Sequence, residues 1–198
     1  MDIQLTTRTG ADLSAALEKV VEMRLRLFSG FPYLYVGTRE MERTYFASFQ
    51  AKAGAVVIEA AVEGVFAGLA TAIPLAQDTY ILDAAEPLFR SAGLDPKELF
   101  YLSELLVEPP FQGKGVGSLL FQAVREEGRR RGFSRCCLME VERPLDHPSR
   151  PRHFGSPVPL WAKAGFRALP GRAFFRYATL LPGGDVADIP NPMIFWCE

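Results

Sequence analysis

The chain has 198 residues, of which 48% are hydrophobic and 23% are charged, and this balance predicts one globular domain with a full hydrophobic core. Such a composition excludes a disordered or low-complexity chain. The 22 basic and 23 acidic residues nearly cancel, so charge gives no general attraction to nucleic acid or to a membrane surface.

Three cysteines, Cys136, Cys137 and Cys197, have a spacing that fits neither a zinc site nor a disulfide framework. We therefore expect no metal site and a reducing compartment. The N-terminus carries no signal-peptide pattern, and no apolar run approaches the ~20 residues that cross a bilayer. Together these features predict a cytoplasmic protein whose partners are neither nucleic acid nor membrane.

Hydrophobic periodicity and turn residues predict alternating helices and strands in the first half of the chain. Thr38 is placed to cap a helix, and Glu63-Gly64 separates two apolar runs as a hairpin turn does. In chain order we expect a strand at 3–7, a helix at 11–28, an aromatic loop at 31–37, a helix from Thr38 to about Gln50, strands at 55–61 and 65–73, and an insert at 74–98 with a short helix at 84–92.

In the second half, a strand ends at Pro109-Pro110 and a glycine cluster leads into a helix. The apolar segment 193–196 is expected to cover the sheet edge or a neighbouring subunit of a homodimer. We expect strands at 100–107 and 135–141, helices at 118–131 and 160–164, a closing hairpin of 166–169 with 174–181, and an irregular end at 182–198. This order predicts an α/β fold with a mixed sheet.

The glycine cluster Gln112-Gly113-Lys114-Gly115-Val116-Gly117 is the most informative segment. Its glycines allow successive backbone amides to face one point, and the following helix N-terminus favours an anion, so a diphosphate is the natural ligand. The sequence of this segment does not match the Walker A pattern, and it matches the dinucleotide-binding fingerprint only in part. A tight turn that needs glycine only for packing is the structural alternative.

Gln112, Gly115 and Gly117, together with the later run from Trp161 to Gly165-Phe166, resemble the two signatures of the GNAT superfamily of acyl-CoA N-acyltransferases. The resemblance implies an α/β fold with a mixed, centrally splayed β-sheet flanked by helices. It also implies one N-acetyltransferase domain over 1–198, with an acyl-CoA-binding core at about 100–167 and acceptor-side elements at about 11–50 and 74–98.

The resemblance further implies acetyl-CoA as co-substrate and a primary amine, on a small molecule or a peptide, as acceptor. Backbone groups of Leu105 and Val107 would bind pantetheine, and the Val107 amide would polarise the thioester carbonyl. Glu104 would be the general base, or else a carboxylate paired with a nearby cation; on a regular strand it faces away from Val107. The pyrophosphate would lie on the amides of Gln112, Gly113, Lys114, Gly115, Val116, Gly117 and Ser118.

Trp161 stands where many members of this family have a tyrosine that protonates the leaving thiolate, and an indole cannot transfer a proton usefully. Ser156, His153 and Tyr177 are candidate replacements, and the thiolate could also leave unassisted. Phe31, Tyr33 and Tyr35 could line an acceptor pocket or simply pack. The departure at Trp161 leaves two main readings open, an active N-acetyltransferase and a non-catalytic acyl-CoA-binding sensor or scaffold. A nucleotide-binding protein unrelated to acyl transfer is the weaker third.

Overall fold

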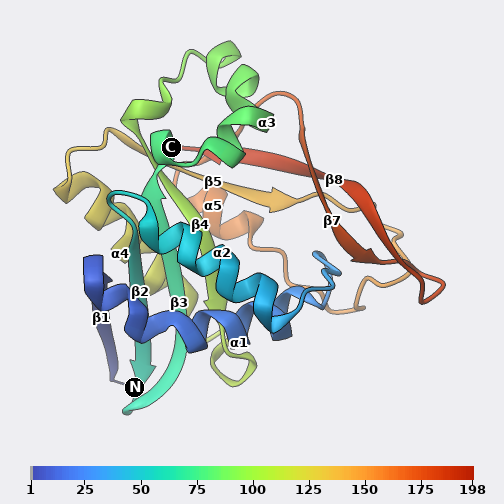
Figure 1. Ribbon diagram of the computed structural model, residues 1–198, viewed down its shortest axis with the longest axis horizontal. Helices are drawn as coiled ribbons and strands as arrows, with labels where there is room; N and C mark the ends of the chain where they lie inside the picture. Colours follow the sequence, from blue (N-terminus) through green and yellow to red (C-terminus); the bar gives the residue numbers. More distant parts are fainter. Residues whose placement is uncertain (1) are drawn as a thin grey trace.

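The computed structural model describes residues 2–198 as an eight-stranded sheet with helices on both faces (Figure 1). The strands follow the order β1-β2-β3-β4-β5-β8-β6, and β7 also pairs with β8. The strands are β1 (Ile3–Thr9), β2 (Val56–Val62), β3 (Val65–Pro74), β4 (Leu99–Val107), β5 (Arg135–Val141), β6 (Arg167–Ala168), β7 (Ala173–Leu180) and β8 (Val186–Cys197). The helices are α1 (Leu17–Phe28), α2 (Arg39–Ala51), α3 (Thr79–Ser91), α4 (Val116–Arg130) and α5 (Val158–Lys163).

Two hydrophobic cores lie on opposite faces of the sheet. One joins α1, α2 and α3 to the sheet through residues such as Phe46, Phe89 and Tyr101, and the other joins α4 and α5 to it through Leu120 and Trp161. Figure 1 shows α1 and α2 crossing one face of β2, β3 and β4, with α4 on the other side. Alternate residues of each central strand therefore enter different cores, as the two-residue period of a strand requires. None of the helices in residues 2–198 is both long enough and apolar enough to cross a membrane.

Most local predictions are confirmed. The β2–β3 hairpin forms, and the Thr38 side chain accepts a hydrogen bond from the Met41 amide at the start of α2. The predicted helix at 11–28 is α-helical only from Leu17, because Gly10–Ala16 forms a 3-10 helix. Helix α4 begins at Val116, two residues earlier than expected.

The predicted closing hairpin and irregular end are wrong. Both β6 and β7 pair with β8 rather than with each other, and β8 is a strand of 12 residues. Pro190 and Pro192 hide this strand in the sequence because proline cannot donate a ladder hydrogen bond. Both prolines pair with β7, and they precede Met193, where pairing with β5 begins. At these two positions the other edge of β8 has no strand beside it, so no backbone donor is needed there.

The same finding corrects the expectation for the apolar segment 193–196. These residues lie inside the sheet. Strand β5 pairs with one edge of β8, and strands β6 and β7 pair with its other edge. Trp196 stands opposite Leu138 of β5. The C-terminal strand therefore packs the Trp196 ring against the core of α4 and α5, level with the last residue pair that joins β4 to β5.

Candidate active site

The sheet opens between β4 and β5. These parallel strands pair only from Leu99 opposite Arg135 to Leu102 opposite Leu138, although both continue beyond that point. A bulge at Ser103 shifts the β3–β4 register at the same place, and the Ser103 hydroxyl is buried with no hydrogen-bond partner among the described residues. The predicted central splay is confirmed, and it leaves one edge of β4 free to bind a ligand.

The glycine loop lies at the end of this free edge. Gly113 and Gly115 have φ of 71° and 88°, a left-handed backbone that favours glycine. Within residues 2–198, the amides of Gly113, Lys114 and Gly115 donate to no backbone carbonyl. The Gln112 side chain donates through Nε2 to the Val107 carbonyl at 3.0 Å, which ties the loop to the end of β4. Free amides in front of a helix N-terminus suit a diphosphate.

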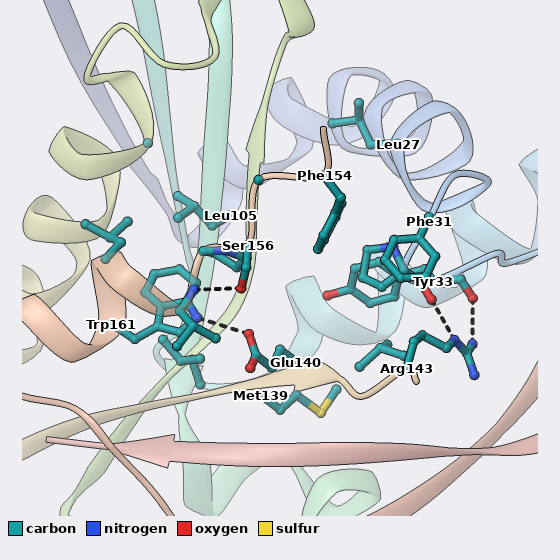
Figure 2. Close-up of a pocket in the computed structure, with 18 of the residues that line it drawn as sticks. Leu27, Phe31, Tyr33, Leu105, Met139, Glu140, Arg143, Phe154, Ser156 and Trp161 are labelled. Atoms are coloured by element: carbon teal, nitrogen blue, oxygen red, sulfur yellow. Dashed lines mark hydrogen bonds between the residues drawn. The ribbon is translucent and has the colours of Figure 1, made fainter. Parts of the chain in front are cut away.

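A cleft of about 1190 Å³ runs from this loop into the splay. Figure 2 shows Leu105, Glu140 and Trp161 on one side of it and Phe31, Tyr33 and Phe154 on the other. Of the residues predicted to bind the co-substrate, Leu105, Val107, Gln112 and Gly117 line this cleft. The insert 74–98 contributes no lining residue; its helix α3 packs instead on β7 through Tyr80 and Phe175, whose ring centroids are 5.3 Å apart.

Glu104 lies on the α1 and α2 side of β4, buried in an ion pair with Arg24. Its second oxygen accepts a hydrogen bond from the Thr71 hydroxyl at 2.8 Å. Arg24 also pairs with the buried Glu42 and stacks on the ring of Tyr45, 3.9 Å from its centroid. Burial alone would lower the pKa of Arg24, but the charges of Glu104 and Glu42 outweigh burial and raise it.

The bulge does not bring Glu104 and Val107 to one face. Because the extra residue, Ser103, precedes Glu104, the alternation from Glu104 to Val107 is regular. Leu105 and Val107 accordingly pack with the α4 and α5 core, and Leu106 packs with the other core. The catalytic role predicted for Glu104 stays a prediction, and the geometry shows the ion-paired alternative directly.

Glu140 of β5 is a feature that the sequence reasoning missed. Both of its carboxylate oxygens accept hydrogen bonds from indole nitrogens, from Trp196 at 3.1 Å and from Trp161 at 3.3 Å. Burial raises the pKa of Glu140, and the two indole hydrogen bonds partly oppose that rise. The signal in the sequence is a single carboxylate within the apolar strand 136–141.

The far wall of the cleft is aromatic. Phe31 and Phe154 meet edge to face with centroids 4.8 Å apart, and the Arg150 guanidinium lies 5.6 Å and 5.1 Å from their ring centres. Arg143 fixes this wall by donating to the carbonyls of Pro32 and Tyr33, at 2.8 Å and 3.1 Å, as Figure 2 shows. An aromatic wall opposite a carboxylate suits an amine-bearing acceptor.

The candidate proton donors are scattered. His153 and Ser156 line the cleft, and the Ser156 hydroxyl accepts a hydrogen bond from the Val158 amide at 3.2 Å. Tyr177 lies outside the cleft lining and donates to the Tyr33 carbonyl at 3.2 Å. Burial raises the pKa of Tyr177 to about 12, which makes its phenol a weak acid. Trp161 lies in the cleft wall with its ring against Phe121.

Comparison with known proteins gives the fold from solved structures and the family from a sequence model. A search of curated proteins found no sequence match. An N-acetyltransferase from Staphylococcus aureus Mu50 superimposes with a TM-score of 0.59 at 14% identity, over 100% of this chain and 98% of that one. The ribosomal-protein-S18-alanine N-acetyltransferase from Escherichia coli gives 0.56 at 14% identity, over 99% and 92%. The yncA protein from Salmonella typhimurium, solved with its cofactor acetyl-CoA, gives 0.58 at 15% identity, over 98% and 93%.

Identities this low show the shared fold alone, and the family assignment comes from a sequence model. The model of the Acetyltransferase (GNAT) family matches residues 19–166. That span contains the glycine loop, both splayed strands and the Trp161 to Phe166 segment. The chain belongs to the Acetyltransferase (GNAT) family.

Proposed function

We propose that the protein is an N-acetyltransferase that moves the acetyl group of acetyl-CoA onto a primary amine by direct attack of the amine on the thioester. One observation carries the proposal: a glycine loop with free backbone amides and the free edge of a splayed strand meet at the end of β4. The loop suits the pyrophosphate of CoA, and the free edge at Leu105 and Val107 suits its pantetheine arm. The yncA structure, which has the same fold, holds acetyl-CoA.

The chain's own contributions would be placement and charge stabilisation. Gly113 to Ser118 would supply amides and the helix dipole to the pyrophosphate, and Lys114 would add a positive charge. Val107 would donate its amide to the thioester carbonyl, where negative charge develops during attack. Gln112 has a positioning role because its side chain holds the Val107 carbonyl. No covalent enzyme intermediate is needed, since a bound amine already lies close to the carbonyl carbon.

The acceptor would enter from the side of Phe31, Tyr33 and Phe154. The cleft has room for a small amine or the end of a peptide beside the pantetheine arm. A name among the structural relatives, that of the Escherichia coli enzyme, refers to a protein alanine acceptor. The aromatic wall supports an acceptor with an apolar or cationic group next to its amine.

Acceptor-dependent thiol release tests the proposal. The protein is mixed with acetyl-CoA and a panel of amino acids, polyamines, aminoglycosides and short peptides, and free CoA thiol is measured. We expect release with at least one amine. We also expect acetyl-CoA to raise the melting temperature, because a ligand that binds only the folded state stabilises it.

Gly117→Glu provides a matched binding variant. It introduces a carboxylate at the first turn of α4, where the nearest atom to an added Cβ is Val107 Cγ2 at 3.5 Å, so charge rather than a clash opposes the pyrophosphate. Gln122→Glu adds the same charge on the exposed face of α4 and is the control. Loss of the acetyl-CoA stabilisation in the first variant alone supports the loop assignment; equal stabilisation in both contradicts it.

Trp161 favours one alternative, a non-catalytic acyl-CoA sensor or scaffold. The indole cannot supply the proton that a tyrosine would supply. The sensor would bind acetyl-CoA with the same loop and would release no thiol with any amine of the panel. Stabilisation by acetyl-CoA without acceptor-dependent thiol release would therefore support the sensor function and contradict the enzyme function.

A further inference from the structure

Glu140 occupies a distinctive position at the splay. On β5, Cys136 and Leu138 face the α4 and α5 core, and Glu140 continues the same face. Leu138 is the last β5 residue paired with β4, so Glu140 lies two residues past the point where the strands separate. This is where the proposed pantetheine arm would end. The carboxylate therefore stands beside the expected place of the thioester.

The residues around Glu140 hydrogen-bond its carboxylate but bring no positive charge to it. Its two hydrogen-bond donors, Trp161 on α5 and Trp196 on β8, are uncharged, and within residues 2–198 Glu140 forms no salt bridge. The nearby Glu142 is already paired with Arg172 at 2.6 Å. Glu104 also lines the cleft, where it is paired with Arg24 on the α1 and α2 side of β4, and Tyr33 faces the cleft from the aromatic loop. The cleft lining also contains Arg143 and Arg150, at the aromatic wall, and His153.

We propose that Glu140 is the proton carrier of the transfer and that Trp161 and Trp196 are its positioning residues. This inference rests on the proposed N-acetyltransferase function. Burial makes the carboxylate more basic than an exposed one, and the indole N–H groups fix both oxygens without protonating them. Trp161 thus replaces a hydroxyl acid by orienting a carboxyl group that can carry the proton.

The protons balance over one turnover. The Glu140 carboxylate takes a proton from the acceptor ammonium, which leaves a neutral amine and a carboxylic acid. The amine nitrogen bonds to the carbonyl carbon, and the C–S bond breaks with its electron pair on sulfur. The Glu140 carboxylic acid then protonates the thiolate. Of the two protons left on the nitrogen after attack, one goes to water and the other stays on the amide. The products are the amide, CoA thiol, one solvent proton and the original carboxylate.

A spectroscopic test needs no acceptor. Trp161 and Trp196 are the only two tryptophans of the chain, and both donate to Glu140, so tryptophan emission should report its ionisation. We expect the emission of the wild-type protein to titrate with a midpoint above the ordinary value of 4.5. In Glu140→Gln this titration should vanish. The same titration in both proteins, with the fold intact by circular dichroism, would overturn the inference.

Kinetics test the role in transfer, with acetyl-CoA and the most reactive amine of the panel. Glu140→Gln should lower kcat/KM by about 10²- to 10⁴-fold, the usual contribution of a general acid and base, and keep the stabilisation by acetyl-CoA. Glu126→Gln, the same change on the exposed face of α4, should leave kcat/KM unchanged. A Glu140→Gln protein as active as the wild type overturns the inference. If the wild-type protein releases thiol with none of the amines in the panel, the proposed function itself is overturned.

Trp161→Phe and Trp196→Phe separate positioning from packing. Each removes one hydrogen bond that favours the ionised carboxyl, so the acidic limb of kcat/KM against pH should move to higher pH. A packing role alone would lower kcat/KM without moving that limb, and this outcome would remove the positioning role. Trp161→Tyr places a hydroxyl acid in the cleft and should make the reaction less dependent on Glu140.

Discussion

Glu104→Gln distinguishes the two roles open to this residue, general base and structural ion-pair partner. The substitution keeps the shape of the side chain and removes its charge. In the structure, Glu104 binds Arg24 and accepts from the Thr71 hydroxyl at 2.8 Å, and its side chain is 2% exposed. A hydrogen bond to a charged group contributes about 1.5–3 kcal/mol, and Arg24 keeps its second partner, Glu42, in the variant. We therefore expect a loss of about 1.5–3 kcal/mol in the free energy of unfolding.

For a domain of this size, each kcal/mol lowers the melting temperature by about 2–4 °C, so the expected decrease is about 3–12 °C. Differential scanning calorimetry measures it, with Glu18→Gln as control because Glu18 pairs with Arg39 and Arg43 at 54% side-chain exposure. The control should lose no more than about 1 kcal/mol.

Activity is then measured at a temperature where both variants are folded. If Glu104 is structural, kcat stays close to the wild-type value. A fall of about 100-fold or more in kcat with an unchanged melting temperature would refute this reasoning and assign Glu104 as the base.

Three further substitutions test the packing and charge of the site. Arg24→Met leaves Glu42 and Glu104 buried without their cation, and calorimetry should show a loss of about 3–5 kcal/mol; a loss below about 1 kcal/mol would contradict the burial argument. Gly68→Ala puts a Cβ 2.5 Å from the Leu106 carbonyl oxygen, so it should cost about 1–3 kcal/mol in chemical denaturation, whereas Gly155→Ala, with open space around it, should cost little. Because the pKa of Glu140 is raised, its contribution to the free energy of unfolding is present at low pH and is lost as pH rises through the folded-state pKa. The melting temperature of Glu140→Gln relative to wild type should therefore increase from about pH 4 to about pH 8. A decrease would show that the pKa is shifted the other way.

Local signals in the sequence predicted most of the fold. The glycine loop and the Thr38 cap depend on residues that are neighbours in the chain, so their conformations follow from short-range sterics and hydrogen bonding. The opposite orientation of Glu104 and Val107 also follows from the strand period, because the bulge at Ser103 lies outside the interval between them.

Long-range pairing was not predictable in the same way. Strand β8 is interrupted by prolines, and its place beside β5 is set by tertiary pairing that no local pattern encodes. Trp196 reaches Glu140 across 56 positions of sequence only because of that pairing. Glu140 was overlooked for the same reason, since its two partners come from α5 and β8. The homodimer, the cytoplasmic location and the absence of a metal stay predictions.

A crystal structure of the protein with CoA tests the central claim most directly. The account predicts pyrophosphate oxygens within hydrogen-bond distance of the amides between Gly113 and Ser118, and pantetheine along the free edge of β4 at Leu105 and Val107. It also predicts the sulfur next to Trp161 and Glu140. A pyrophosphate bound elsewhere on the surface, or a splay that excludes pantetheine, would contradict the account.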